Sequence, residues 1–274
     1  MKFGEARVLQ RADANAMVDN RPAVIRMAEV GMTYRTRRGE VTALSNLSFN
    51  IRENEFVTVV GPSGCGKSTI LKIVSGLLQA SRGKVEVFGE AVTSPRPDAG
   101  MVFQQPRLLK WRTVLDNVLL PIEIMRQPKA KYVDRAMDLL ALAGVKDTAH
   151  MRPSELSGGM QQRVAICRAL VYDPRLLLMD EPFGALDALS RDIMNVELMK
   201  IWSERKKTTL LITHSIPEAI FLADRVLVMS PRPGTVVEDV EIDLPRPRHP
   251  RVRATPAFLE LSSRIHRLLG VEYA

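Results

Sequence analysis

One short segment restricts the possible fold of this chain more than any other. Residues 61–68 read Gly-Pro-Ser-Gly-Cys-Gly-Lys-Ser, which matches the spacing G-x-x-x-x-G-K-[ST]. The five residues before it, Phe-Val-Thr-Val-Val, predict a buried strand, and the apolar residues at 70, 71, 73, 74, 77 and 78 repeat as in a helix. A strand, a glycine-rich turn and a helix in this order predict an anion-binding loop in a layered α/β fold.

The residue types of this loop suit the phosphates of a nucleotide. Glycines let backbone N–H groups curl around phosphate oxygens. We expect Lys67 to reach the β- and γ-phosphates as a point charge, and the Ser68 hydroxyl to ligate Mg²⁺. The alternative is a plain strand-to-helix turn with a solvated lysine, and the flanking pattern disfavours it.

Two acids follow a second apolar run. Leu-Leu-Leu-Met at 176–179 precedes Asp180 and Glu181. Such a run predicts a central strand that delivers carboxylates to the crevice where parallel sheets bind ligands. We expect Asp180 to hold Mg²⁺, directly or through water, and Glu181 to orient or deprotonate an attacking water. The alternative is that these acids cap a helix or pair with lysine.

A second glycine pair stands ahead of another predicted helix. Residues 156–163 read Leu-Ser-Gly-Gly-Met-Gln-Gln-Arg, so Ser157, Gly158 and Gly159 would open a helix and present partial positive charge outward. A lengthy insert at about 106–153 separates this helix end from the phosphate-binding loop. The two anion sites are predicted to serve one nucleotide.

With three further motifs, these segments resemble the nucleotide-binding subunit of an ATP-binding-cassette (ABC) transporter over about residues 25–229. The motifs arrive in the family's order: Walker A at 61–69, a Q-loop at 102–106, the signature at 156–161, Walker B at 176–181, a D-loop at 184–187 and the switch residue His214. One position departs, because the family often has serine where Gly184 stands. The resemblance implies an α/β P-loop NTPase (ABC-type) core with an antiparallel β subdomain and a helical signature subdomain.

The resemblance also implies roles in catalysis and metal binding. Glu181 and Lys67 would be catalytic, Gln104 would sense the γ-phosphate, and His214 would hydrogen-bond it. Mg²⁺ would be held by Ser68, Gln104 and Asp180.

Nucleotide and dimer contacts follow from the same resemblance. ATP would contact Tyr34, Gly61, Pro62, Ser63, Gly64, Cys65, Gly66, Lys67, Ser68 and Thr69 of one chain and Ser157, Gly158 and Gly159 of another. Tyr34, in an early turn beside Gly31 and before Arg35, would stack on adenine, although a partly buried surface tyrosine is the alternative. Leu186 and Asp187 would lie at the dimer contact.

Three kinds of partner are implied. Two copies would pack head to tail, each ATP lying between the Walker A motif of one and the signature of the other. Multi-span permease subunits would dock on the helical subdomain near Gln104 and residues 107–111, where Trp111 is either a docking or a core residue. An extracytoplasmic substrate-binding protein would act through the permease.

The chain divides into three predicted parts. Residues 1–22 are expected to be loose, 23–230 to form the ATPase domain with its helical subdomain at about 106–172, and 231–274 to form a Pro/Arg-rich linker and an amphipathic helix. Alternating patterns at 24–51 and 84–88 predict an antiparallel sheet. Helices are predicted at 113–125, 133–142, 187–202 and 216–223. The final helix carries its apolar residues Phe258, Leu261, Ile265, Leu268 and Leu269 on one face.

Two segments without catalytic residues, 106–113 and 243–248, resemble importers for nitrate, sulfonate, taurine and related small compounds. The expected function is therefore the ATP-hydrolysing subunit of an importer for a small compound, an anion of that type. The alternative is a soluble ABC ATPase that acts on nucleic acid or ribosomes. The chain carries one cassette rather than two fused copies, which disfavours it.

Charge and hydropathy bound the partners and the location. The net charge is +8 and the pI about 9.7. The basic residues gather mainly at Arg35, Arg37 and Arg38 and at Arg246, Arg248, Arg251 and Arg253. Without interleaved aromatics, these clusters predict a solvated face, or attraction to anionic lipids, and no nucleic acid. No apolar stretch spans a bilayer and no signal core opens the chain, so we expect a peripheral protein on the cytoplasmic face of the cell membrane. Cys65 and Cys167 form no metal-like pair, and no disulfide is expected.

Overall fold

A six-stranded sheet forms the centre of the molecule. The computed structural model describes residues 21–37, 39–184 and 186–270, so the prediction for residues 1–22 lies almost wholly outside the described part. The strand order is β10-β9-β3-β8-β7-β6; β10 pairs antiparallel with β9, and the other neighbours pair in parallel. The strands are β3 (Phe56–Val60), β6 (Ala99–Val102), β7 (Leu176–Asp180), β8 (Thr208–Ile212), β9 (Arg225–Met229) and β10 (Val236–Glu241).

The sheet separates two apolar cores. Successive side chains of a strand point to opposite faces, so a strand covered on both sides is apolar throughout. In β3, Phe56 and Val60 join one core, whereas Val57 and Val59 join the other. In β7, Leu177 and Met179 face the first core in the same way. This explains why these strands are apolar runs rather than alternating patterns.

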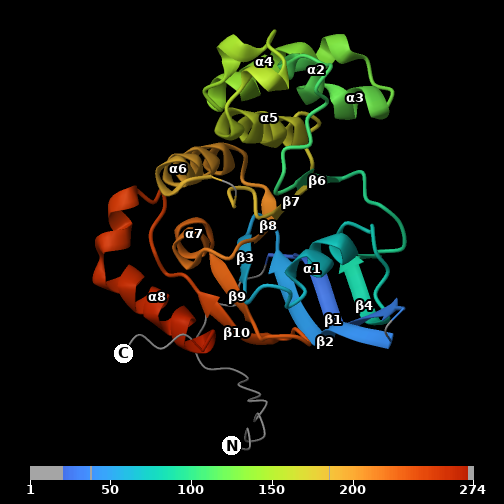
Figure 1. Cartoon of the computed structure of the whole chain (residues 1–274), viewed down its shortest axis with the longest axis vertical. Coiled ribbons are helices and arrows are strands. Elements are labelled where there is room, and N and C mark those ends of the chain that lie inside the picture. Colours follow the sequence, from blue (N-terminus) through green and yellow to red (C-terminus); the bar gives the residue numbers. More distant parts are fainter. Residues whose placement is uncertain (1–20, 38, 185, 271–274) are drawn as a thin grey trace, which may run out of the picture.

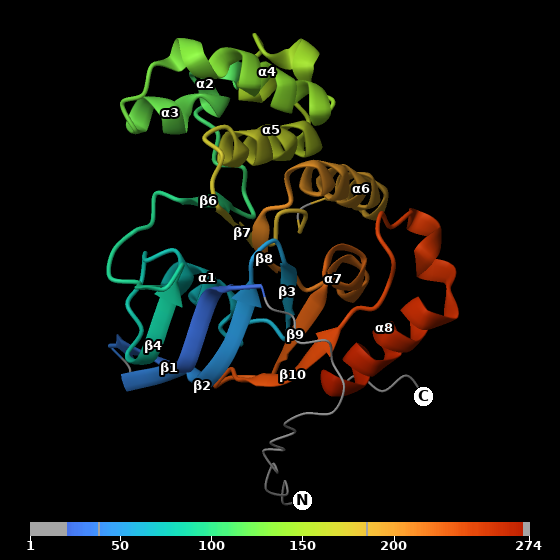
Figure 2. The ribbon, with the colours of Figure 1, turned by 180° about the vertical axis from the view of Figure 1, so that it is seen from behind.

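The second core is covered by a four-stranded antiparallel sheet. Its order is β2-β1-β4-β5, as the alternating pattern at 24–51 and 84–88 predicted. It packs on the same side as α1, visible in Figures 1 and 2. The elements are β1 (Ala23–Thr36), β2 (Gly39–Arg52), β4 (Arg82–Val87), β5 (Glu90–Ala91) and α1 (Lys67–Val74).

Four helices gather beyond the β6–β7 end of the sheet (Figure 1). They are α2 (Val114–Val118), α3 (Leu120–Ile124), α4 (Val133–Leu142) and α5 (Gly158–Leu170). The Thr113 hydroxyl caps α2 by accepting from the Asp116 N–H over 3.1 Å. The predicted helix at 113–125 is thus two short helices, joined at Leu119. Trp111 beside this group is 71% exposed, which decides against a core residue.

The first core is covered by three further helices. They are α6 (Ala188–Arg205), α7 (Ile216–Leu222) and α8 (Pro256–Leu268). Pro217 stands in the first turn of α7, as predicted. Phe258 and Ile265 of α8 are buried in the first core, and α8 runs along the outside of α7 (Figure 2). The final helix therefore packs against the ATPase core.

Short 3₁₀ turns complete the chain. They are η1 (Lys129–Tyr132), η2 (Lys146–Thr148), η3 (Pro153–Glu155) and η4 (Pro250–Ala254). Among the described residues, no helix combines the length and the apolar character needed to cross a bilayer.

The expectation that the C-terminal arginines form a solvated face holds for Arg251, which is exposed, and is wrong for Arg246, Arg248 and Arg253. Arg248 is 5% exposed and its guanidinium donates to five backbone carbonyl oxygens: those of Ile220, Phe221, Ala223, Ile242 and Leu244. Arg246 lies over the Trp202 ring at 4.4 Å and donates to Asp224 and to the Leu222 carbonyl oxygen. Arg253 pairs with Asp192 of α6. Arg246 and Arg248 thus place positive charge at the C-terminal end of α7.

Candidate functional site

The phosphate-binding loop connects β3 to α1 as the sequence predicted. Gly64 and Gly66 have φ angles of +76° and +106°, a left-handed conformation that favours glycine. A Cβ on Gly66 would also lie 2.6 Å from Leu44 Cδ2 of β2. The glycine spacing therefore follows from both the turn and the close approach of β2. It leaves the N-terminus of α1 open at Lys67.

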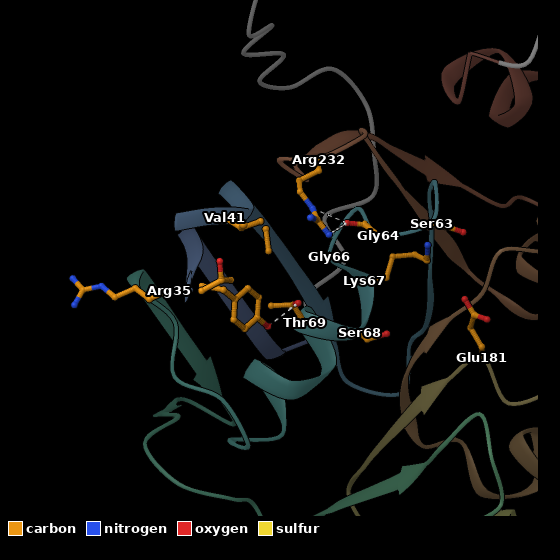
Figure 3. Close-up of a pocket in the computed structure, with 13 residues that line it drawn as sticks. Arg35, Val41, Ser63, Gly64, Gly66, Lys67, Ser68, Thr69, Glu181 and Arg232 are labelled. Carbon is orange, nitrogen blue, oxygen red and sulfur yellow. Dashed lines mark hydrogen bonds between the residues drawn. The ribbon is translucent and has the colours of Figure 1, made fainter. Parts of the chain in front are cut away.

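Lys67 lies across this loop with its ammonium group inside the curve. It is 7% exposed, and its Nζ donates to the Gly61 and Pro62 carbonyl oxygens over 2.8 and 3.0 Å. Figure 3 shows it beside Ser63 and Ser68, which line the same cavity. A positive charge is therefore held where an anion would enter the loop.

Ser68 connects the loop to the end of β7. Its hydroxyl donates to Asp180 Oδ1 over 3.0 Å. Burial raises the pKa of Asp180, and the neighbouring Glu181 charge raises it further, whereas the Ser68 hydrogen bond lowers it. A divalent cation would relieve the cost of these adjacent acids, and hydroxyl and carboxylate oxygens are the ligands that Mg²⁺ prefers.

Two protein oxygens, the Ser68 hydroxyl and Asp180 Oδ1, meet at the end of β7. Mg²⁺ at nucleotides takes one or two protein oxygens and completes its shell with phosphates and water. Ser68 and Asp180 are suited to that arrangement.

Glu181 lies within hydrogen-bond distance of two other predicted site residues. Its Oε2 lies 3.2 Å from His214 Nδ1 and 3.4 Å from Gln104 Nε2. The three residues follow β7, β8 and β6, which are neighbours in the sheet. Adjacent parallel strands end at one edge, so residues far apart in the chain meet there. Glu181 also has a φ of +44°, an uncommon conformation for a side chain with a Cβ, of the kind found at functional sites.

Gly184, the departure from the family pattern, lies against this cluster. A Cβ there would be 3.3 Å from Gln104 Nε2 and 3.3 Å from Glu181 Oε2. Both distances are tighter than an ordinary contact, so a side chain would push on the two residues. The glycine leaves them room.

Tyr34 is placed differently from the prediction of an early turn. It lies within β1, paired with Val41 of β2, and its hydroxyl is 3.1 Å from Thr69 Oγ1 in α1. Gly31 does not form the turn that was expected beside Tyr34, because β1 continues through it. The long β1–β2 hairpin carries the Tyr34 ring to the phosphate-binding loop. An aromatic face therefore lies beside the loop, as adenine stacking requires.

A cavity of about 580 Å³ lies between the phosphate-binding loop, Tyr34 and Glu181. It is lined by Tyr34, Arg35, Thr36, Val41, Ala43, Ser63, Gly64, Gly66, Lys67, Ser68, Thr69, Glu181 and Arg232. Of the predicted nucleotide contacts, Gly61, Pro62 and Cys65 are not among its lining residues, and Cys65 is 1% exposed. Sequence reasoning missed Arg232 and the β2 residues, since only their pairing with distant segments brings them here.

The signature residues lie elsewhere. Ser157 caps α5 by accepting from the Met160 N–H over 3.3 Å, so Gly158 and Gly159 open the helix as predicted. None of the three lines the cavity, because α5 belongs to the helical group beyond the sheet (Figure 1). One chain thus carries two separate anion-binding features.

The D-loop runs between the acidic strand end and α6. Asp187 caps α6 by accepting from the Ser190 N–H over 3.0 Å, and these hydrogen bonds lower its pKa. Leu186 Cδ2 would lie 4.0 Å from a Cβ on Gly159, so the D-loop approaches the signature of its own chain.

A buried glutamate, Glu218, lies close to His214 in the chain and hydrogen-bonds to both of its neighbours. Glu218 is 3% exposed, accepts from the Thr213 hydroxyl, and has its own N–H capped by the Ser215 hydroxyl at 3.4 Å. These two partners flank His214. Burial raises the pKa of Glu218, the Thr213 hydrogen bond opposes it, and Arg191 stands among its charged neighbours.

Comparisons with known proteins agree with this geometry. The model of the ABC transporter family matches residues 44–184, just over half of the 274-residue chain. A taurine import ATP-binding protein of Rhizobium johnstonii is 44% identical over 90% of this chain and 96% of its own. A bicarbonate transport ATP-binding protein of Synechocystis is 41% identical over 87% and 86%.

Solved structures agree as well. The dimeric structure of MJ0796, described as a bacterial ABC transporter cassette, has a TM-score of 0.71 and 33% identity over 80% of this chain and 99% of that one. The same cassette is known in a post-hydrolysis state bound to ADP and Pi. The chain belongs to the ABC transporter family and is one of its ATP-binding ATPases.

Proposed function

We propose that this chain is the ATP-hydrolysing subunit of a membrane importer for a small anion of the nitrate, sulfonate or taurine type. The observation that carries the proposal is the split of the anion-binding groups. Lys67, Ser68 and Glu181 share one cavity, whereas Ser157 and Gly158 open a helix outside it. A complete site then needs two chains.

A head-to-tail dimer joins the two halves. The α5 helix N-terminus of one chain faces the γ-phosphate held by the loop of the other, and its N–H groups and partial positive charge complete the anion site. Leu186 and Asp187 lie at the contact. The dimeric cassette MJ0796, 33% identical, supports this assembly.

Hydrolysis depends on positioning and on charge. Ser68, Asp180 and Gln104 would hold Mg²⁺, which would supply positive charge to the phosphates. Lys67 lies along the phosphates. Glu181 orients the attacking water and takes its proton, and His214 donates a hydrogen bond to the γ-phosphate. Phosphoryl transfer needs little covalent help, so these contacts account for the rate.

Two of the loop residues assigned to ATP shape the loop from within. The Pro62 carbonyl oxygen accepts from the Cys65 N–H and from Lys67 Nζ, and the Cys65 side chain packs inward without lining the cavity. Tyr34 stacks on adenine, and its hydroxyl bond to Thr69 holds the ring beside the loop.

The permease docks on the helical group next to Gln104. A groove of about 370 Å³ opens there. Ile124, which lines it, is 72% exposed, and Trp111, which precedes α2 in the same helical group, is 71% exposed. Its lining combines apolar and cationic side chains: Met101, Phe103, Leu120, Ile124 and Met125 with Arg96, Arg107 and Arg168. This suits a short amphipathic helix with acidic residues. Movement at Gln104 when the γ-phosphate binds would pass to that helix.

The transported compound never touches this chain. Specificity resides in the permease and in an extracytoplasmic binding protein, and the taurine and bicarbonate relatives, whose compounds are small and carry a sulfonate or a carbonate anion group, support the class. The chain works at the cytoplasmic face of the membrane through the permease.

Mixed dimers test the proposal. Variant A carries Lys67→Ala and variant B carries Ser157→Arg, which blocks the signature helix end. Each alone should be inactive, whereas an equimolar mixture should regain about a quarter of the wild-type rate, since half the dimers are mixed and each has one intact site. No recovery in the mixture, or full activity of variant B alone, would contradict a shared site.

Co-purification with a multi-span membrane protein tests the importer assignment, and nuclease-sensitive ribosome association would favour the alternative.

A further inference from the structure

The connection between β9 and β10 is fastened to the antiparallel sheet. We call residues 230–235, which form it, the strap. The Gly234 N–H donates to the Ala43 carbonyl oxygen over 2.9 Å, and the Ser45 N–H donates to the Gly234 carbonyl oxygen over 3.0 Å. Ala43 itself lines the nucleotide cavity. The strap therefore has a fixed position relative to the site.

Gly234 also brings the strap into contact with the phosphate-binding loop. A Cβ on Gly234 would lie 2.0 Å from the Cys65 carbonyl oxygen. That oxygen belongs to the backbone and cannot move aside unless the loop moves. Strap and loop thus pack backbone against backbone, and only glycine permits it.

Arg232 reaches from the strap to the rim of the cavity. Its Nε and Nη2 donate to the Gly64 carbonyl oxygen over 3.1 and 2.9 Å. Figure 3 shows the guanidinium beside Gly64, in the cavity that Lys67 also lines. Hydrogen bonds from a charged donor are stronger than neutral ones, and the fork of arginine directs two of them at one point.

The Gly64 carbonyl matters for the shape of the loop that would hold an anion. A trans peptide is planar, with its C=O and N–H pointing in opposite directions. Holding the Gly64 oxygen toward Arg232 therefore holds the Cys65 N–H on the other side of that peptide, where it donates to the Pro62 carbonyl oxygen over 3.3 Å and closes the curve of the loop. Gly64 has a φ of +76° and lacks a side chain, so its backbone has little intrinsic preference for this orientation.

We propose that Arg232 is a positioning residue for ATP binding. It orients the Gly64–Cys65 peptide of the phosphate-binding loop and adds positive charge at the loop's rim, where the triphosphate enters. The inference rests on the proposed function, since it takes this cavity to be the ATP site. It assigns the strap a part in nucleotide affinity that none of the cassette motifs supplies.

Three variants test it. Arg232→Ala removes fork and charge, Arg232→Lys keeps the charge only, and Arg251→Ala removes the same charge from an exposed position in the tail. ATP affinity by titration calorimetry, KM and kcat for ATP hydrolysis, and the melting temperature without nucleotide are measured for each.

We expect Arg232→Ala to weaken ATP binding and raise KM roughly tenfold, as the loss of one charged hydrogen-bonding group does, with kcat within about twofold. Arg232→Lys should recover part of the affinity. Arg251→Ala should match the wild type.

Unchanged ATP affinity in folded Arg232→Ala would overturn the inference, whether or not the melting temperature falls. If that variant does not fold, wild-type affinity in Arg232→Lys overturns it equally. Lys67→Ala separates this failure from a failure of the proposed function. Wild-type ATP affinity in Lys67→Ala would mean that the cavity is not the ATP site, whereas affinity lost there and kept in Arg232→Ala defeats the role of Arg232 alone.

Discussion

Glu181 Oε2 lies 3.2 Å from His214 Nδ1, so the proposed base and the proposed switch residue are already in hydrogen-bond contact. The direction of this hydrogen bond depends on the tautomer of the imidazole ring. In either case the contact holds the His214 ring beside Glu181, at the sheet edge where the phosphate-binding loop also begins.

Replacing Glu181 with glutamine should separate ATP binding from hydrolysis. The amide keeps the shape of the side chain and loses the charge and basicity that activate water. We expect kcat to fall by about 10²- to 10⁴-fold, the usual contribution of a general base. ATP affinity should stay within a few-fold, and the variant should accumulate as an ATP-bound dimer, measured by light scattering. Hydrolysis at the wild-type rate would mean that another group activates the water.

The room beside Gly184 predicts a difference between two small substitutions. Gly184→Ala adds a methyl group at 3.3 Å from both Gln104 Nε2 and Glu181 Oε2, and these side chains must shift. Gly184→Ser adds the same carbon but also a hydroxyl that can donate to Glu181. We expect kcat to fall several-fold for alanine and less for serine, with similar KM. Steady-state kinetics of the pair decide it, and equal rates would show that the crowding is harmless.

The buried Glu218 makes a pH dependence of stability predictable. Its pKa is raised mainly by burial, so the folded state holds this proton more tightly than the unfolded state. Stability is therefore lost as the pH rises from the unfolded pKa, about 4.3, through the folded pKa. Glutamine has no such proton.

We compare the free energy of unfolding of Glu218→Gln with that of the wild type. The value for the variant minus the value for the wild type should increase as the pH rises through this window, because only the wild type loses stability from this group. Urea unfolding at several pH values between 4.5 and 8 measures the difference, in which the other ionisable groups cancel. A difference that does not vary with pH would show that Glu218 titrates normally.

The tail arginine Arg248 predicts a large loss of stability. Burial lowers its pKa to about 10, so it is still charged at neutral pH, and its removal takes a donor from five carbonyl oxygens, of which that of Ile242 keeps the Leu244 N–H. We expect Arg248→Ala to lose about 2–4 kcal/mol and the melting temperature to fall by roughly 5–10 °C. Thermal unfolding beside the exposed Arg251→Ala provides the comparison. Equal melting temperatures would mean that solvent replaces these bonds.

The motifs could be predicted because their chemistry is local. The spacing of Gly61, Gly66 and Lys67 defines a turn at a helix N-terminus, and the apolar run before Asp180 defines a buried strand. Each conclusion needs only neighbours in the chain. The choice of Gln104 and His214 came from the family resemblance, and the structure brings both to Glu181 because parallel strands end at one edge.

Other features depend on partners distant in sequence, and the local sequence pattern does not predict them. Arg248 looks like a solvated residue until the C-terminal carbonyls of α7 are known to face it. Tyr34 was placed in a turn because Gly31 precedes it, whereas pairing with β2 keeps it in a strand. Arg232 joined the site only through the folding of the strap. The boundaries of the predicted domains stay a prediction.

The burial of Arg248 determines where the protein can be truncated. α7 follows directly from the switch residue His214, and the donors that satisfy its final turn arrive from beyond β10. A version cut after β10 would keep every residue that lines the nucleotide cavity and still remove Arg248, the donor to the last carbonyl oxygens of α7. Fusion partners belong after α8, not in place of it.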